Sequence, residues 1–445
     1  MNKEERIVSR LTKALAALIA LAAALLLVAC GGGDDDESDD SGSSTGEPVE
    51  ITFWHGQTQG PAELLQQMID EFNKEHPDVV VSKDSGGVNS DRMLQKVTAG
   101  LQADNYPDIA YIYGSDLANL AGGEQLVDLT EAIDNGDLDW DRFVEAGTTA
   151  VTVDDRPRAV PAFIDNLAVV YNKKIFDDAG VEYPTDDWTW DEFLATAAEL
   201  NDPDAGIAGF GWPGTGDEDT TWRIWPLIWQ QGGEIVSEDG DSVGFDGEPG
   251  EAALGVAAQA ADDGSVYIDS TAGSERMQQL FASGKMAMNV AGPYTLPEYV
   301  DAKVDYGVVS MPSFGDEHTT IAGPDTWAIF DNGEERVAAA LEFMDWFSEP
   351  EQQLRWITEA GSLPLTADVQ DAEGFAGYER SLPDLDKFIE NTELARTRAT
   401  IPEYPQISQA LGKAVASVLY GEAEPSEALA EAVETSNAEL QVPGS

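Results

Sequence analysis

The chain has 445 residues, more than one small domain needs, and carries 24 Lys and Arg against 84 Asp and Glu, a formal net charge of −60. This balance excludes nucleic acid as a partner, because a phosphate backbone requires a basic surface, and it argues against a basic face on anionic lipid. Hydrophobic residues make up 42% and aromatic residues 9%, so we expect an acidic surface over a packed core rather than a disordered chain.

The N-terminus has the pattern of an export signal. Four basic residues lie within residues 1–13, and an apolar run of sixteen residues follows at 14–29. This run is shorter than the roughly 20 residues that span a bilayer. The only cysteine, Cys30, comes directly after it and resembles the lipid-modified cysteine of a bacterial lipobox. The sequence therefore predicts a lipoprotein signal peptide at 1–29 and lipidation of Cys30.

The next segment, residues 30–48, is a low-complexity acidic stretch in which Cys30 precedes a run without apolar residues. It cannot bury a core, so we predict a flexible tether. No later segment has the length and hydrophobicity of a membrane span. The body is therefore expected to be soluble and extracytoplasmic, held by lipid to the outer face of the cell membrane, on the periplasmic side if an outer membrane is present.

The first part of the body alternates strand and helix patterns. Strands are predicted at 49–54, 79–81 and 107–113, with helices at 61–75 and 90–103. This βαβαβ order predicts an α/β fold with a mostly parallel sheet flanked by helices. Ligands of such sheets bind beyond the carboxyl ends of the strands.

A second α/β region begins near residue 161. A strand is predicted at 167–171 and a Gly-, Pro- and Asp-rich loop at 201–221. Helical patterns are predicted at 173–179, 189–200, 275–283, 334–347, 350–360, 405–420 and 424–440.

Motifs for chemistry are weak. Residues 209–214 match GxGxxG, but Pro213 and the acids after it stand where a dinucleotide site needs a helix start. One cysteine and three histidines far apart in sequence give no metal-binding pattern, so neither metal nor cofactor is expected. Carboxylates are too abundant for a catalytic pair to stand out, and an exported glycoside hydrolase stays an alternative.

Aromatic residues are the stronger signal. The chain has 11 tryptophans, several of them in predicted loops or at strand ends. Aromatic faces pack on the C–H patches of sugar rings, while polar side chains bind the hydroxyls. We expect Trp222 and Trp327 to contact a ligand, and Trp346 and Trp356, on amphipathic helices, to lie in the core.

An ordered set of segments carries a family resemblance. They include VEITFWHG, PDIAYIYGSD, VPAFIDNLAVVYNKKIFDDAGVE, WPLIWQQGGEI, LFASGKMAMNVAGPY, AGPDTWAIF and AALEFMDWFSEPEQQ, and the likeness covers essentially all of 49–440. Together they resemble extracellular solute-binding proteins of ABC transporters, in particular the sugar-binding, maltose-binding-like group.

The resemblance implies a two-lobe, periplasmic-binding-protein-like fold that closes on its ligand about a hinge. Crossings between the lobes are expected near 160–161, 306–307 and 349–350. The N-terminal lobe would comprise 49–160 and 309–348, and the C-terminal lobe 161–308 and 349–445.

Matching the family pattern position by position implies a set of ligand-binding residues. Arg398 is the weakest match, and Tyr294 stands where a stacking Trp is usual. Asp116 replaces a basic residue, which puts maltose itself in doubt. The implied set comprises Trp54, His55, Gln57, Tyr113, Ser115, Asp116, Phe163, Asp165, Trp222, Tyr294 and Arg398, and the aromatic argument adds Trp327.

The function implied is binding without catalysis. The protein would capture a mono- or oligosaccharide outside the cell and deliver it, as a monomer, to the permease subunits of an ABC importer. A polyamine is the serious rival ligand, because Asp116 and Asp165 among aromatic walls would suit a cation.

Overall fold

The computed structural model describes residues 47–85, 92–315 and 318–441. The predicted signal peptide, Cys30 and all but the last two residues of the predicted tether lie outside these ranges. Within them, no helix combines the length and the hydrophobicity that crossing a membrane requires.

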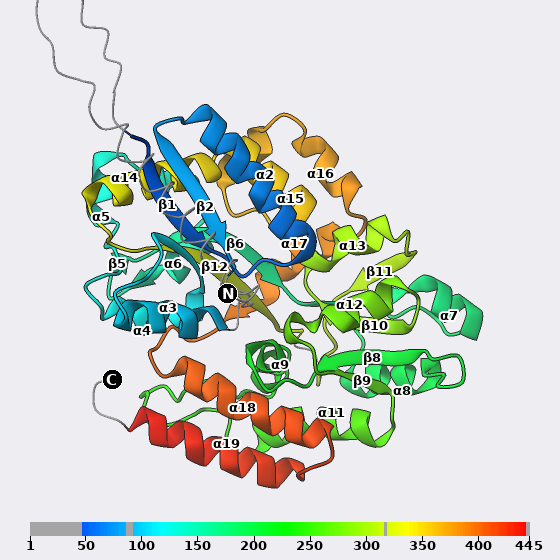
Figure 1. Ribbon diagram of the computed structural model, residues 1–445. Helices are drawn as coiled ribbons and strands as arrows, with labels where there is room; N and C mark the ends of the chain where they lie inside the picture. Colours follow the sequence, from blue (N-terminus) through cyan, green and yellow to red (C-terminus); the bar gives the residue numbers. More distant parts are fainter. Residues whose placement is uncertain (1–46, 86–91, 316–317, 442–445) are drawn as a thin grey trace, which may run out of the picture. The chain divides into compact units, whose positions relative to one another are not determined.

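Two mixed sheets form the framework of the fold (Figure 1). In the first sheet the strand order is β13-β12-β3-β1-β2, and β6 also pairs with β12. Its strands are β1 (Val49–Trp54), β2 (Val79–Asp84), β3 (Ile109–Tyr113), β6 (Val160–Asn166), β12 (Thr320–Ile329) and β13 (Ala395–Thr397). β1 pairs in parallel with β2 and β3, whereas β12 runs antiparallel to both β3 and β6.

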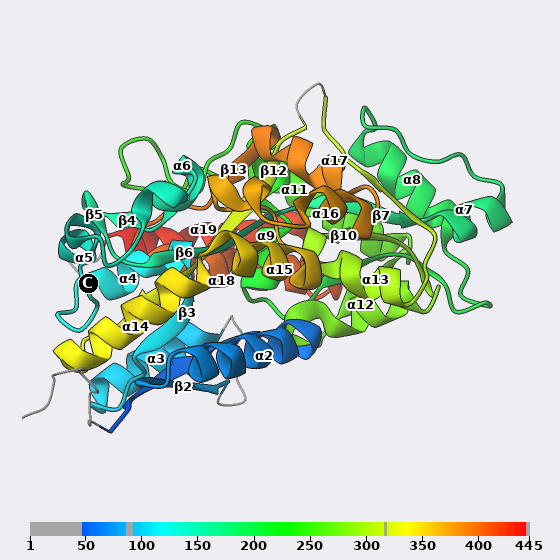
Figure 2. The same cartoon turned by 90° about the horizontal axis from the view of Figure 1, so that it is seen from above.

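Helices cover both faces of the first sheet. On one face lie α2, α14 and α15, and Figure 2 shows α2 and α15 side by side, as their contacts require. On the other face lie α3 and α4. Their bounds are α2 (Gln59–Glu75), α3 (Met93–Gln102), α4 (Leu117–Ala121), α14 (Glu334–Phe347) and α15 (Pro350–Ala360). The apolar spacing along α2 explains its position, because Leu65, Met68 and Phe72 share the buried side.

The second sheet has the order β11-β7-β10-β8-β9. Its strands are β7 (Ala168–Asn172), β8 (Ala208–Pro213), β9 (Val266–Asp269), β10 (Met286–Ala291) and β11 (Tyr306–Val309). One core cluster joins it to α8 (Trp190–Leu200), α10 (Trp225–Gln230), α11 (Glu248–Asp262), α18 (Tyr404–Leu419) and α19 (Pro425–Leu440). Side chains of α12 (Glu275–Ala282) and α13 (Leu296–Asp301) instead share a cluster with the first sheet.

The remaining elements are short. They are α5 (Thr130–Asn135), α6 (Glu145–Ala150), β4 (Thr152–Val153), β5 (Arg156–Pro157), α7 (Lys173–Ala179), α9 (Glu218–Trp222), α16 (Phe375–Ser381) and α17 (Leu385–Asn391). Short 3-10 helices join some of these elements, and two of them, η2 (Gly114–Asp116) and η5 (Pro293–Thr295), contribute to the site described below.

The expectation of an α/β fold with helix-flanked sheets is confirmed, and the predicted strands and helices are present with small shifts of their ends. The predicted lobe boundaries stay a prediction. Residues 350–360, assigned to the second lobe, form α15, which lies against α2; Trp356 of this helix stacks on Phe163 of the first sheet with ring centroids 5.5 Å apart.

The loop predicted at 201–221 is wrong, because this segment contains β8 and α9. The glycines that suggested a loop, or a GxGxxG turn, serve close packing. A Cβ on Gly209 would lie 2.2 Å from the carbonyl oxygen of Ala197 on α8. A Cβ on Gly211 would lie 2.7 Å from the side chains of Met277 and Met286. At Gly209 the neighbouring atom belongs to the backbone, so only glycine permits this approach, and both glycines mark a tightly covered strand.

An ion pair between the buried carboxylate of Asp108 and the partly exposed Arg336 joins the start of β3 to α14. Asp108 is fully buried and accepts hydrogen bonds from the backbone N–H of Thr52 at 2.7 Å and from Arg336 Nε at 2.7 Å. Asn332 Nδ2 donates to the same carboxylate at 3.1 Å. The carboxylate therefore joins β1, β3 and the segment that leads into α14.

We predict that Asp108→Ala lowers the free energy of unfolding by about 3 kcal/mol, because it leaves the Thr52 N–H and a guanidinium without their acceptor. Urea unfolding of the ligand-free protein measures this. The exposed Asp301 at the end of α13 provides the control, since Asp301→Ala should change stability by less than about 0.5 kcal/mol. Equal effects of the two changes would contradict the role given to Asp108.

Candidate ligand-binding site

The candidate site begins where β3 and β6 end beside the first half of β12. Tyr113 of β3 and Phe163 of β6 both lie opposite Asp325 of β12, and Asp165 lies opposite Gly323. Residues 323 and 325 share one face of β12, because side chains alternate along a strand. Directly opposed residues also share a face, so both carboxylates and Tyr113 belong to the same face of the sheet.

Two side chains from elsewhere in the chain lie over this face at Gly323. A Cβ on Gly323 would be 3.2 Å from the indole ring of Trp222 and 3.3 Å from Nη2 of Arg398. Trp222 ends α9, and its ring is nearly parallel to that of Tyr294 in η5, at 20° with centroids 6.4 Å apart. Because Gly323 has no side chain, the indole ring of Trp222 can lie directly over the sheet at this position.

Arg398 holds α9 and α18 to the end of the first sheet. Its Nη1 donates to Glu218 Oε1 at 2.9 Å, and its guanidinium carbon lies 5.2 Å from the ring centre of Tyr113. Glu218 also accepts from the hydroxyl of Tyr404 at 2.9 Å and from that of Ser408. Glu218 is thus fully engaged by partners of the described protein.

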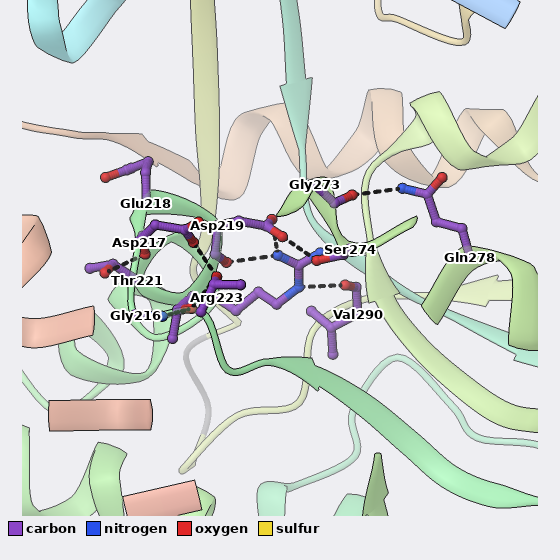
Figure 3. A network of polar contacts seen from close by, with 12 residues as sticks. Gly216, Asp217, Glu218, Asp219, Thr221, Arg223, Gly273, Ser274, Gln278 and Val290 are labelled. Carbon is purple, nitrogen blue, oxygen red and sulfur yellow. Dashed lines mark hydrogen bonds and ion pairs between the residues drawn. The ribbon is translucent and has the colours of Figure 1, made fainter. Parts of the chain in front are cut away.

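A second ion pair holds α9 to the second sheet (Figure 3). Arg223 donates through Nη1 to Asp219 Oδ1 at 2.5 Å and through Nε to the carbonyl of Val290, at the end of β10, at 3.0 Å. The hydroxyl of Ser274 donates to the other oxygen of Asp219. Because α9 has only five residues, these contacts rather than its own helical bonds keep Trp222 in place.

Carboxyl groups dominate the electrostatics of the site: Asp165 and Asp325 are buried, and Asp116 is partly buried. Burial, followed by the charge of Glu218, raises the pKa of Asp116 to about 7. Burial likewise raises the pKa of Asp325 to about 7, although the neighbouring Arg398 lowers it. Burial and the charge of Asp325 raise the pKa of Asp165 well above its usual range. These values place Asp116, Asp325, Glu218 and Arg398 close enough for their charges to interact.

Asp165 is a buried acid with one carboxyl oxygen that no described residue contacts through a hydrogen bond. Its side chain is 6% exposed, and Oδ1 has no hydrogen-bond partner within the part of the chain that the structure describes. The indole N–H of Trp222, over the same face, is also without a partner there. Nε of Arg398 and the hydroxyl of Ser115 are likewise buried without a partner among the described residues. Buried polar atoms are almost always satisfied in folded proteins, so these four atoms are candidates for contact with a ligand.

Trp54 and His55, at the end of β1, have partners of their own. Trp54 is on the opposite face of its strand from Phe53 and packs on α3, with Lys96 Nζ 4.0 Å from its ring centre. His55 is 3% exposed and accepts from the backbone N–H of Gln57 at 3.2 Å. Burial, with the nearby charge of Lys83, lowers the pKa of His55 to about 4, so it is neutral at pH 7.

Two of the predicted aromatic contacts are core residues instead, which corrects the expectation for them. Trp327 is 1% exposed and packs edge-on against Phe53, with centroids 4.9 Å apart. Phe163 is 5% exposed and stacks on Tyr111 and Trp356. Trp327 lies two residues further along β12 than Asp325, on the same face, where helices already cover the sheet.

Tertiary structure thus brings together Tyr113, Asp116, Asp165, Trp222, Tyr294 and Arg398. Ser115, in η2, is buried, and its hydroxyl has no hydrogen-bond partner within the described residues.

Sequence reasoning missed Asp325 and Glu218. The alternation of side chains along the strand AGPDTWAIF could have indicated Asp325, since Asp325 lies on the same face as Trp327, which was predicted to contact the ligand. Glu218 was missed because its segment was predicted to be a loop. Among the described residues no group of acidic, His or Cys side chains could hold a metal ion.

Comparison with known proteins identifies the family. Residues 55–354 match the family described as bacterial extracellular solute-binding protein. The chain belongs to this family. Its members are binding proteins that work outside the cytoplasm, as the resemblance in the sequence implied.

Individual relatives are distant but cover nearly the whole chain. The sn-glycerol-3-phosphate-binding periplasmic protein of Pectobacterium atrosepticum is 24% identical over 88% of this chain and 91% of its own. The cyclic α-maltosyl-1,6-maltose binding protein of Arthrobacter globiformis is 27% identical, with a TM-score of 0.69 over 88% of this chain and 99% of its own. The acarbose-binding GacH receptor of Streptomyces glaucescens is 25% identical, with a TM-score of 0.77 over the same shares.

We predict that Asp325 makes ligand-free stability fall as the pH rises. Its folded pKa of about 7 exceeds the unfolded value of 3.8, so the folded state binds the extra proton between these values. The stabilisation is complete below about pH 4 and lost as the pH rises through 7. At each pH we compare the free energy of unfolding of the wild type with that of the Asp325→Asn variant. This difference should fall by roughly 2–4 kcal/mol as the pH rises from about 4 to above about 7.

Urea unfolding at a series of pH values measures this difference. The exposed Asp70 on α2 supplies the control, because Asp70→Asn should leave the pH profile parallel to that of the wild type. Parallel profiles for Asp325→Asn as well would show that its carboxyl ionises normally in the folded protein.

Proposed function

We propose that this protein captures a mono- or oligosaccharide outside the cell and delivers it to an ABC import permease. One observation carries the proposal: the indole of Trp222 lies over Gly323, next to the buried carboxyls of Asp165 and Asp325 on the same sheet face. A flat aromatic surface beside carboxyl acceptors, one of which (Oδ1 of Asp165) lacks a partner among the described residues, suits a sugar ring, since its faces are apolar and its edge carries hydroxyls.

The relatives support the same assignment. The proteins from Arthrobacter and Streptomyces are described by the carbohydrates or carbohydrate analogues that they bind. A protein of the same fold from Listeria monocytogenes, 22% identical with a TM-score of 0.78, is described as an ABC substrate-binding protein in complex with cycloalternan. Delivery to permease subunits follows from this class of transporter, and closure of two lobes about the sugar would present the loaded form.

The N-terminus completes the proposal. Residues 1–29 would be removed as a signal peptide, Cys30 would carry lipid, and the acidic segment to residue 48 would let the monomeric body reach its permease from the outer face of the membrane. Two hinge-linked lobes would use the crossings predicted near 160–161, 306–307 and 349–350.

We predict that Trp222→Ala weakens binding of the best sugar by about 1–3 kcal/mol, because it removes one aromatic wall. Ligand-free stability should change much less, since the indole is only partly buried. Thermal shift with a panel of sugars identifies the ligand, and isothermal titration calorimetry then compares the proteins.

Trp140 is the matched control for this experiment. It is also half-buried, but it packs against both core clusters of the first sheet, with its ring centre 5.7 Å from that of Phe143. Trp140→Ala should leave the sugar affinity within about twofold, that is, within about 0.4 kcal/mol. Unchanged affinity in Trp222→Ala would mean that the sugar binds elsewhere or that no sugar is the ligand.

We predict that Cys30→Ser releases the protein from the membrane or blocks its processing while leaving the fold intact, because lipid on Cys30 would be the anchor. Fractionation of cells and mass spectrometry of the mature N-terminus measure this. A wild-type protein that lacks lipid and partitions with the soluble fraction would contradict the lipoprotein assignment.

A further inference from the structure

The guanidinium of Arg398 is bound by the protein on one side only. Its one hydrogen bond within the described residues runs from Nη1 to Glu218 Oε1, at 2.9 Å. Nε is buried and has no partner there, on a side chain that is 4% exposed. Nε and Nη2 share one edge of the planar guanidinium, and this Nε–Nη2 edge donates two parallel N–H groups. Nη2 would be 3.3 Å from a Cβ on Gly323, so the edge lies over the sheet.

Other polar groups without partners surround the same glycine. The indole carbon Cε2 of Trp222, which is bonded to the unpartnered Nε1, would be 3.6 Å from a Cβ on Gly323. Asp165, whose Oδ1 has no partner among the described residues, lies directly opposite Gly323 in the pairing of β6 with β12. A purely structural role for Arg398 would leave these buried atoms unsatisfied, which is rare in folded proteins.

Glu218 fixes the orientation of the guanidinium. Its carboxylate accepts hydrogen bonds from the hydroxyls of Tyr404, at 2.9 Å, and Ser408, as well as from Nη1 of Arg398. Tyr404 and Ser408 belong to successive turns of α18 and lie on the same side of it. Two hydroxyls of a 16-residue helix therefore hold the carboxylate that holds Arg398.

Close packing of α9 on α18 keeps Glu218 in this position. One turn beyond Ser408, a Cβ on Gly412 would lie 2.6 Å from the hydroxyl oxygen of Thr221 in α9. The same hydroxyl donates to the carbonyl of Ser408 at 2.8 Å. The place of Glu218 is thus set by the contact between the two helices, and Arg398 is oriented by it.

We propose that Glu218 is a positioning residue for ligand binding: by holding Nη1 of Arg398, it directs the Nε–Nη2 edge toward two adjacent hydroxyl oxygens of one sugar unit. This inference rests on the proposed carbohydrate function and narrows its ligand class to saccharides with a free vicinal diol in the unit next to Trp222. Each oxygen of the diol accepts one N–H of the edge, and one of the two hydroxyls donates to Oδ1 of Asp165.

A carboxylate or phosphate is the other chemistry that binds such an edge, because arginine holds both in the same two-pronged way. The surroundings disfavour it, since the site already contains four acidic side chains: Asp116, Asp165, Asp325 and Glu218. The charge of Arg398 also acts on Asp116 and Asp325 and is paired with Glu218. A neutral diol uses the N–H groups without adding negative charge, so the observations favour the diol.

Sugars that lack single hydroxyls test the diol on the mature full-length chain. A thermal-shift panel of glucose, galactose, mannose, xylose and their di- and trisaccharides selects the tightest binder, and glucuronic and galacturonic acids are included as anions. Isothermal titration calorimetry then compares this sugar with derivatives that each lack one hydroxyl. We call the loss of affinity in each derivative its deoxy penalty. For two neighbouring positions of one unit, the wild-type deoxy penalty should be at least about tenfold, because each derivative loses a hydrogen bond to a charged group.

Variants of Glu218 and Arg398 supply a readout that a purely structural role would not move. In Glu218→Gln, the parent sugar should bind about tenfold more weakly, and the two neighbouring deoxy penalties should shrink together to less than about threefold, because their coupling to the edge is lost. Penalties at other positions should stay unchanged. Arg398→Lys should give the same pattern, because an ammonium group lacks the two-pronged edge.

The matched control is Asp108→Asn. It weakens another pair of a buried carboxylate with an arginine, Arg336, and should lower stability without changing any deoxy penalty. Circular dichroism and the melting temperature check the fold of every variant. If Glu218→Gln does not fold, Glu218→Asp takes its place, because it keeps the charge and withdraws the carboxylate by one methylene.

The outcomes separate this inference from the function on which it rests. Deoxy penalties that survive in the Glu218 variant overturn the positioning role, whatever Arg398→Lys shows, and leave carbohydrate capture standing. Tighter binding of a uronic acid than of its neutral sugar overturns the diol. Failure of every saccharide in the panel to bind overturns both the inference and carbohydrate capture.

Discussion

The antiparallel pairing of β12 with both β3 and β6 is the constraint on which the site depends. Tyr113, Asp165 and Asp325 are far apart in the sequence, and the register of these two pairings alone brings them to one face of one sheet. The same register places Gly323 where the indole of Trp222 approaches. A shift by one residue would turn Asp325 to the opposite face and Thr326 toward the ligand, because side chains alternate along a strand.

Along β12, core residues and candidate site residues lie only a few positions apart. At Trp327 the face is covered by α14 and α15 and forms part of the aromatic core. At Gly323, two steps further along that face, side chains from α9 and from the segment after β13 lie over the sheet. Strand ends at the margin of a helical layer therefore supply the polar groups of the site, as is general for open α/β sheets.

Electrostatics connects the site to the whole chain in two different ways. On the surface, an excess of acidic residues is solvated and costs little per residue, since salt and water screen it. Inside the site, Asp165 and Asp325 are buried and Asp116 is partly buried, so desolvation, with the charges of neighbouring acids, raises their pKa values. The contacts of Glu218 with Arg398, Tyr404 and Ser408 show the alternative, a buried carboxylate fully satisfied within the protein. Glu218 finds all its partners within the protein, whereas Oδ1 of Asp165 has none among the described residues, and this contrast points to an external partner for Asp165.

By itself the sequence determined the fold class, most helices and strands, and the family, because apolar periodicity is a local property and the ordered segments are matched along the chain. It also placed Asp165, Trp222 and Tyr113 among the candidates. Only the tertiary structure decided that Trp327 and Phe163 are core residues, that Trp54 lies on the opposite face, and that Asp325 and Glu218 belong to the site. The physical reason is that burial and charge at a residue depend on which distant segments cover it. At Gly209 and Gly211, too, close contact with α8 and α12 and with Met286, rather than a turn, explains the glycine, and no local pattern contains that contact.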